Sequence, residues 1–415
     1  MRTVKRNALF SFSFLIFFLK INTISAITAY VWQPLEITFK ADSVYSNPYV
    51  EVNMWVELHG PDFSKRVYGV WDGGQTFKVR ILAASAGDWS WVSGSNQPDN
   101  SGLNHRKGSF KAVNWSEQEL AENPNRRGVI RATENGHALE YADGSPFFLL
   151  SDTWWAASTW RIPYKGTAPA KDYEPGPGIG FEELVSYRKK QGYNSISLIA
   201  AFPNWDTDNL SYRYWDENGV CIRTAWEKWG YMTEESENEF YYAAKDMHDE
   251  EGNRSFAMLP NREGVPDYDR VNPDYFRNLD KKIRYLYDEG FAAFLEPIRR
   301  DACPAWKAYF DYNTSYARFV NYMIARYGVY NLIFSGIHFD NYAVMQGRIA
   351  SLKAEEFNEA LNYMHETYGP PPFGQLMTTL VNRSTYRFFG HGAVSYTHLT
   401  LPTNRVAGGW GWWGG

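Results

Sequence analysis

Cysteine is scarce in this sequence, which has two in 415 residues, Cys221 and Cys303. Two cysteines can form one disulfide in an oxidising compartment, but they exclude a fold built on a disulfide framework. The HExxH pattern and the Cys/His spacings typical of zinc sites are also missing. The sequence therefore predicts no metal site and no cofactor.

Positive charge and long apolar runs are scarce as well. The net charge is −5, so the basic face expected of a nucleic-acid-binding protein is not indicated. No run of 18 apolar residues follows residue 26, so we expect no stable membrane insertion of the mature chain. A GxGxxG fingerprint is missing after the first expected strand, which disfavours a dinucleotide-binding fold.

Residues 1–26 have the pattern of a secretory signal peptide. Arg2, Lys5 and Arg6 precede an apolar stretch over residues 8–19, and Ala26 is a small residue at the expected cleavage point. The apolar stretch is too short to cross a bilayer comfortably. We therefore expect the mature chain to be secreted or periplasmic.

Aromatic residues are abundant, with 17 tryptophans and 29 tyrosines. These side chains suit surfaces that are apolar at one end and wet at the other. Sugar rings have apolar faces rimmed by hydroxyl groups, so the excess fits carbohydrate binding. A large aromatic core would explain the same composition, and composition leaves both interpretations open.

Residues 27–115 alternate between apolar and polar side chains with a period of two. The alternation is clearest over residues 51–58 and 77–81, and the turn sequences HGPD, WDGG and SAGD separate the runs. This pattern predicts an antiparallel Ig-like β-sandwich. The polar residues 116–127 that follow are expected to form a linker.

Beyond residue 128, short apolar strands alternate with helical patterns. Strands are expected at 147–150, 195–201, 291–295, 332–334 and 376–381, and helices at 181–191, 275–289, 316–324 and 357–368. Repeated βα units with apolar strands indicate a parallel sheet buried on both faces. We expect residues 128–392 to form a partial (β/α)8 TIM barrel, truncated after about five strands.

Residues 393–415 have no useful helical or strand period. The segment SYTHLTLPTN (395–404) resembles the translation of a sequencing adapter, and a Gly/Trp string follows it. We therefore interpret residues 393–415 as an artefactual tail and exclude them from the fold.

Two blocks of sequence resemble known families. ELHGP (57–61), VWDGG (70–74), FKVR (77–80), GDWS (87–90) and NRRGVIR (125–131) are similar to the Ig-like domain that precedes certain glycoside hydrolase barrels. YADGSPFFLLSDTWW (141–155), NPDYF (272–276) and ARYG (325–328) resemble the apiosidase-like glycoside hydrolases. One departure is Ser151, which stands where a GDT-type signature has glycine.

The resemblance implies an exported glycoside hydrolase that cleaves a plant or algal polysaccharide by carboxylate acid/base chemistry. In such barrels the chemistry lies at the carboxyl ends of the strands, and two carboxylic groups usually share it. The resemblance puts Asp340 at the end of strand four as the general acid. Its partner would normally come from a later strand, and Glu296 is the partner available here. The alternative is a non-catalytic carbohydrate-binding protein.

The expected substrate-binding residues also follow the strands: Asp152, Trp154, Trp155, Asn204, Trp205, Asp206, Arg299 and His338. The indoles can stack on a sugar face, Asp152 can hydrogen-bond hydroxyl groups, and Arg299 or His338 can tune the acid. Residues 203–273 are expected to form a lid or subsite wall, because so long a connection is usually functional.

Structural roles remain open for several of these residues. Asp152 suits a helix N-cap, and Trp154 and Trp155 suit core packing between a strand and the first helix. Glu296 can pair with Arg299 or Arg300. His338 can be a core histidine, Asp340 can cap a loop or bind Arg348, and residues 203–273 can be an ordinary insertion.

Overall fold

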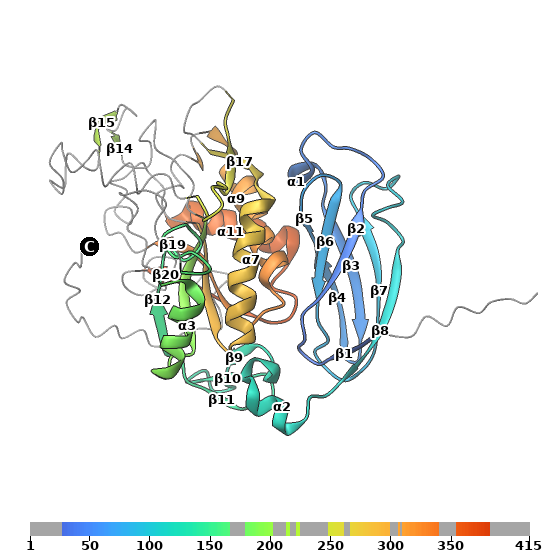
Figure 1. Cartoon of the computed structure of the whole chain (residues 1–415). Coiled ribbons are helices and arrows are strands. Elements are labelled where there is room, and N and C mark those ends of the chain that lie inside the picture. Colours follow the sequence, from blue (N-terminus) through green and yellow to red (C-terminus); the bar gives the residue numbers. More distant parts are fainter. Residues whose placement is uncertain are drawn as a thin grey trace, which may run out of the picture.

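The structure is a computed structural model that describes residues 27–166, 179–201, 213–215, 221–224, 248–260, 266–298, 306–307, 309–339 and 354–381. The predicted signal peptide and the excluded tail lie outside these residues, as does Cys303. Figure 1 shows N-terminal strands on one side of three helices and a second sheet on the other. The helices are α7 (Pro273–Asp288), α9 (Tyr312–Tyr327) and α11 (Ala354–Tyr368).

Eight strands between residues 27 and 113 form two sheets, which we call the N-terminal sheets. One has the order β1 (Ile27–Tyr30), β8 (Lys107–Val113), β7 (Gly87–Ser95), β3 (Met54–Gly60), β4 (Phe63–Tyr68). The other has the order β2 (Leu35–Lys40), β6 (Thr76–Ile81), β5 (Val70–Trp71). The predicted period of two is confirmed in β3, where every second side chain is buried. Buried rows from both sheets meet in one hydrophobic core.

The stretch predicted as a linker is folded. Ser116 and Glu119 form a reciprocal capping box that starts helix α2 (Glu117–Glu122), and the 3-10 helix η1 (Pro124–Arg127) follows. The Asn125 amide then donates to the backbone oxygens of Tyr287 (2.9 Å) and Phe291 (3.0 Å). These buried bonds tie the connection to the end of α7.

Three short antiparallel strands cover one end of the second sheet: β9 (Ile130–Ala132), β10 (Leu139–Tyr141) and β11 (Pro146–Phe147). The strand predicted at 147–150 was wrong. Gly144, at φ +87°, closes a turn that pairs Phe147 with Leu139 instead. Part of the apolar run therefore belongs to the cap formed by β9, β10 and β11, and Phe148 is 80% exposed. The first parallel strand is β12 (Ser151–Thr153).

The second sheet, which we call the parallel sheet, has the order β12, β13 (Ser195–Ala201), β18 (Ala292–Ile298), β19 (Leu332–Phe339), β20 (Leu376–Val381). All four pairings are parallel. Helix α3 (Phe181–Lys190) precedes β13, and α7, α9 and α11 precede β18, β19 and β20. Apart from strand one, the predicted order of strands and helices is confirmed. Closure into a barrel is not tested by the described strands.

Two strand pairs that the sequence did not indicate occur in the long connection before α7. β14 (Arg213–Trp215) pairs with β15 (Cys221–Thr224), and β16 (Phe256–Met258) pairs with β17 (Pro266–Val271). Their short, irregular registers explain why no clear alternation marks them. The second pair leads directly into α7.

A buried ion network joins the N-terminal sheets to the helices. Arg326 of α9 is fully buried and donates to both Asp280 oxygens at 2.8 Å and to Asp72 at 3.0 Å. Arg80 of β6 also binds Asp280, at 2.5 Å. Burial alone would raise the pKa of Asp280, but the two arginines outweigh it and lower this pKa to about 2.

Candidate active site

The carboxyl ends of the parallel strands bring a buried carboxylate next to polar and aromatic groups. Glu296 of β18 lies in register with Ile199 of β13, and its side chain is 0% exposed. Ser335 of β19 lies in register with Thr378 of β20. One residue beyond the Leu295–Phe334 pair, the β18–β19 register puts Glu296 level with Ser335. Four neighbouring strands thus contribute side chains at one level of the sheet.

These side chains lie on the sheet face away from the helices. Two residues earlier on the same strands, Phe294 and Ile333 pack against the cap residues of β9–β11. The alternate residues Leu295 and Phe334 belong instead to the core shared with the helices. Glu296 therefore points to the sheet face that in a closed barrel is the interior. This geometry suits a group that works at the strand ends.

The two indoles after β12 have different environments. Trp154 is 9% exposed and packs edge-on against Phe181 of α3, with ring centroids 5.8 Å apart. It therefore fills the core between the strand and the first helix. Trp155 is half-buried and packs against Ile199, whose amide donates to the Trp155 oxygen at 3.2 Å. Trp155 is the indole that lies beside the Glu296 level.

The Asp152 carboxylate is turned toward α3. It accepts from Arg188 Nε at 2.5 Å and from Trp154 Nε1 at 2.7 Å, both through Oδ2. Its Oδ1 accepts from the amide of Thr153 at 2.9 Å. No helix starts within residues 153–166, so Asp152 is not an N-cap. In the structure, the Asp152 carboxylate helps to hold Trp154 and helix α3 in place. Its contact with sugar hydroxyl groups stays a prediction.

Several predicted site residues fall outside the described part of the chain: Asn204, Trp205, Asp206, Arg299 and Asp340. The backbone of His338 is in β19 and pairs with Leu380, but its side chain is not described. Of the predicted set, Asp152 and Trp154 are in direct contact, whereas Glu296 and Trp155 each neighbour Ile199. The roles of the others stay predictions.

The sequence reasoning missed Ser335, Thr378 and Arg188. Ser335 and Thr378 were hidden inside runs of strand residues, where only the register shows which side chains share a face with Glu296. Arg188 lies in the basic last turn of α3 and would have been interpreted as a surface charge. No local signal distinguishes these residues from their neighbours.

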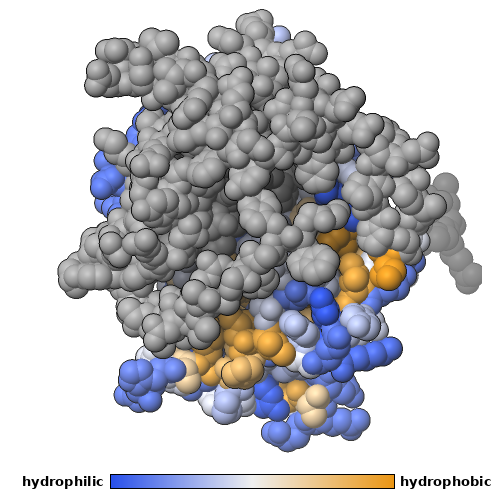
Figure 2. Space-filling view, turned by 90° about the vertical axis from the view of Figure 1, so that its left-hand side faces the viewer, coloured by the Kyte–Doolittle hydropathy of each residue, from blue (hydrophilic) through white to orange (hydrophobic). Residues whose placement is uncertain are grey.

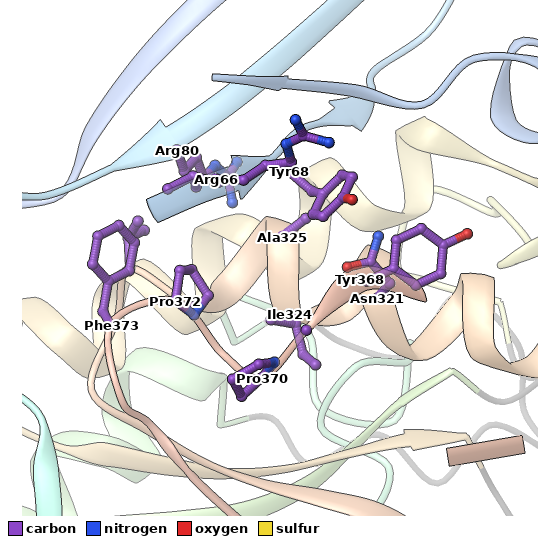
Figure 3. Close-up of a pocket in the computed structure, with 14 residues that line it drawn as sticks. Arg66, Tyr68, Arg80, Asn321, Ile324, Ala325, Tyr368, Pro370, Pro372 and Phe373 are labelled. Carbon is purple, nitrogen blue, oxygen red and sulfur yellow. The ribbon is translucent and has the colours of Figure 1, made fainter. Parts of the chain in front are cut away.

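A cavity does occur elsewhere, between the N-terminal sheets and α9. Figure 3 shows that β4 and β6 side chains such as Tyr68 and Arg80 face Asn321 and Ile324 of α9 and Tyr368 of α11 across it. Its volume is about 20 Å³, which is room for roughly one water molecule. Ligand pockets are on the order of 300–1,000 Å³, so this cavity does not hold a sugar.

Hydrophobic side chains gather on one face of the molecule. Figure 2 shows them on the side where β12 and α3 lie in Figure 1. Exposed large apolar residues near these elements are Phe148, Leu150, Ile179 and Tyr187. Phe148 and Leu150 precede β12, which has one strand neighbour among the described residues.

In the part of the chain that the structure describes, no three His, Cys, Asp or Glu side chains come together as a metal site would require. None of the described helices combines the length and the apolar character needed to span a bilayer.

Sequence profiles of two families match the chain. The profile described as the apiosidase-like catalytic domain matches residues 133–389. The profile of a domain of unknown function, DUF5060, matches residues 28–96. None of the curated proteins compared with the chain matches it.

Several solved structures that match this chain are described as glycoside hydrolases. A candidate glycoside hydrolase from Bacteroides vulgatus ATCC 8482 is 17% identical, has a TM-score of 0.52, and is matched over 85% of this chain and 56% of its own. A glycoside hydrolase family 5 protein from the same organism is 16% identical (TM-score 0.34; 62% and 40%). A family 5 mannosidase from Rhizomucor miehei is 11% identical (TM-score 0.35; 66% and 60%). The chain spans less than two thirds of each.

Proposed function

Because the chain belongs to the apiosidase-like catalytic domain family, we propose that it hydrolyses glycosidic bonds at the carboxyl ends of its parallel strands. The observation that carries the proposal is the position of Glu296. This carboxylate is fully buried, lies at the level of Ile199, and so has the Trp155 indole close by. Buried carboxylates are rare unless they are paired or functional.

The proposed chemistry uses two carboxylic groups. Asp340 follows β19 directly and is our candidate for the general acid that protonates the leaving oxygen. Glu296 is the candidate nucleophile or base. A separation of about 5–5.5 Å between the two would give retention, and about 6.5–9.5 Å inversion. Trp155 would stack on a sugar ring, with Asn204, Trp205, Asp206, Arg299 and His338 holding hydroxyl groups.

We also propose that the substrate is a plant or algal polysaccharide and that the protein is exported. The apolar stretch after Arg2, Lys5 and Arg6 supports export. The many Trp and Tyr residues support a carbohydrate substrate. The signal peptide is tested by sequencing the N-terminus of the secreted protein, which we expect to begin at Ile27.

The parallel sheet is proposed to be part of a (β/α)8 barrel, preceded by an Ig-like sandwich. Five parallel strands with intervening helices support the barrel. The match to 56% of the Bacteroides vulgatus protein supports a fragment of a longer enzyme. Sequencing the gene across codon 392 tests this. We expect the frame to continue into further βα units, one of which ends in an acid.

Hydrolysis is tested by reducing-sugar release from a panel of plant and algal polysaccharides. Glu296→Gln and Asp340→Asn are each expected to lower turnover by about 100-fold or more. Glu289→Gln, an exposed pair partner of Lys189, is the matched control and is expected to keep turnover within about twofold.

The turnover of the variants and the binding of polysaccharide by the wild type distinguish the two proposed functions. Full activity of Glu296→Gln removes Glu296 from the reaction. Polysaccharide binding by the wild-type chain without any hydrolysis would favour the alternative, a non-catalytic carbohydrate-binding protein.

A further inference from the structure

Helix α7 buries a lysine that contacts two separate loops. The side chain of Lys282 is 1% exposed. Its amine donates to the backbone oxygen of Ile162 at 2.8 Å and to Glu250 Oε2 at 3.0 Å. Ile162 belongs to the loop between β12 and α3 (residues 154–166), and Glu250 to the segment before β16 (residues 248–253).

A second polar contact lies one turn earlier on the same helix face. Asn278 Nδ2 donates to Asp249 Oδ2 at 2.5 Å, and Asp249 is fully buried. The other Asp249 oxygen accepts from the amides of Glu251 (2.9 Å) and Asn253 (2.8 Å). Residues 278 and 282 are four apart and therefore face the same way. The segment 248–253 is thus folded around contacts to α7.

The two loops are also bonded to each other. The amide of Trp160 donates to the His248 oxygen at 2.9 Å, and the amide of Tyr164 donates to Glu250 Oε1 at 3.0 Å. Glu250 therefore accepts from Lys282 with one oxygen and from the other loop with the second. Removing the lysine would leave both loops without their common donor.

The loop that Lys282 holds carries the two indoles of the candidate site. It begins with Trp154 and Trp155 and ends where Pro163 accepts from the amide of Phe181 at 2.8 Å. The Lys282 amine lies 6.0 Å from the centre of the Phe181 ring, and Trp154 packs edge-on against the same ring. A shift of the loop would therefore move Trp155 relative to Ile199.

Burying a lysine is costly, and a simple packing role does not require one. Burial lowers the pKa of Lys282, and the Glu250 carboxylate opposes this change. Asp249 also favours the charged form, whereas Lys281 disfavours it. Methionine would fill similar space without a charge, so the property that the site uses is the capacity of the amine to donate to two acceptors at once.

We propose that Lys282 is a positioning residue that fixes the loop 154–166 against the segment 248–253 and thereby sets the place of Trp155 at the strand ends. The effect on loop order stands on these contacts alone. The effect on turnover rests on the proposed function.

Hydrogen exchange in the full chain tests the loop contacts. In Lys282→Met, exchange over residues 154–166 and 248–258 is expected to be about tenfold faster or more, because the Glu250 carboxylate and the Ile162 carbonyl lose their common donor. Arg284→Met is the control, because this arginine lies on the same helix, is 72% exposed and pairs with Asp288 of α7 instead of with either loop. Its exchange is expected to change by less than about twofold.

A second variant covers the case in which Lys282→Met does not fold. Glu250→Gln keeps a similar shape but replaces one of the two oxygens that accept from Lys282 and from the amide of Tyr164 with an NH2 group. A several-fold faster exchange of the same peptides is expected. Unchanged exchange in Lys282→Met, or in Glu250→Gln if only that variant folds, overturns the proposal.

Kinetics on a hydrolysed polysaccharide separates positioning from plain stability. Lys282→Met is expected to raise KM about tenfold at a temperature where the variant is fully folded, with Lys282→Arg recovering part of the loss. Faster exchange with unchanged KM and kcat would limit Lys282 to a structural role and overturn the positioning of Trp155. If the wild type hydrolyses nothing, the proposed function fails while the exchange result still decides the loop contacts.

Discussion

On helix α7, Asp280 lies on the face toward the N-terminal sheets, and Lys282 lies on the face toward the loop 154–166 and the segment 248–253. Asp280 is bound by two arginines from different elements, Arg80 and Arg326, so its charge is compensated from both sides of the interface. Lys282 is bound by one carboxylate and one backbone oxygen, both from loops. The two residues lie on opposite faces of the same helix.

The contacts of Asp280 and Lys282 therefore have different structural roles. The Asp280 network is multidentate and joins residues that are 200 or more positions apart, so its loss affects the whole fold. The Lys282 contacts hold loops that lie on an already folded helix, so their loss affects local order. Buried ion pairs of the first kind are costly to break from one side, because an uncompensated charge remains.

The largest effect is expected from breaking the interface network. Arg326→Met leaves the buried Asp280 and Asp72 with fewer donors, and we expect the free energy of unfolding to fall by about 3–5 kcal/mol. Urea denaturation measures this. The control is Arg284→Met on α7, whose side chain is 72% exposed and whose loss is expected to cost less than about 0.5 kcal/mol. A loss below about 1 kcal/mol for Arg326→Met would show that the network is not stabilising.

Acid pH tests the same network through Asp280. Its pKa in the folded chain is about 2, below the ordinary value of 3.8, so its stabilising effect is present above the ordinary value and is lost as pH falls toward 2. The gap in unfolding free energy between wild type and Asp280→Asn is expected to shrink by about 2 kcal/mol between pH about 5 and about 2. Asp274→Asn, an exposed site on α7, is the control. A gap that does not change with pH contradicts the assignment.

A smaller effect is expected at β12. Asp152→Asn removes the charge that faces Arg188 and weakens the acceptor for Trp154, which we expect to cost about 1 kcal/mol. Hydrogen exchange over residues 151–155 is expected to be faster by several-fold. Unchanged exchange together with weaker polysaccharide binding would mean that Asp152 contacts the sugar after all.

The smallest effect is expected at an exposed pair. Lys189 and Glu289 are 2.9 Å apart, with side chains 51% and 35% exposed. Glu289→Gln is expected to change the free energy of unfolding by less than about 0.5 kcal/mol. A change as large as that of Arg326→Met would remove the contrast between buried and exposed pairs.

Most of the fold was predictable, because its signals are local. The period-two pattern of β3 and the helical pattern of α7 each report a face that must be buried, whatever covers it. The strand predicted at 147–150 was wrong because an apolar run does not say which partner buries it. Phe147 pairs with a strand of the cap β9–β11, and the first strand of the parallel sheet begins at Ser151.

The candidate site was predictable in part. Glu296 could be named because it directly follows the apolar run 291–295, at the expected carboxyl end of a strand. The roles of Trp154 and Trp155 could not be separated from the sequence. Both are tryptophans at adjacent positions, and they differ only in which part of the folded chain each side chain packs against. Lys282 and Arg188 resembled surface charges, since their partners come from distant segments.

The sequence by itself determined the two-part organisation, the order of the later parallel strands and their helices, and the family, because each depends on residues close together in the chain. Only the tertiary structure decided that Trp154 packs inside while Trp155 lies beside Ile199, and that one helix binds Arg326 on one face and two loops on the other. Such outcomes depend on strand register and on charges that meet across many residues. No local pattern carries that information.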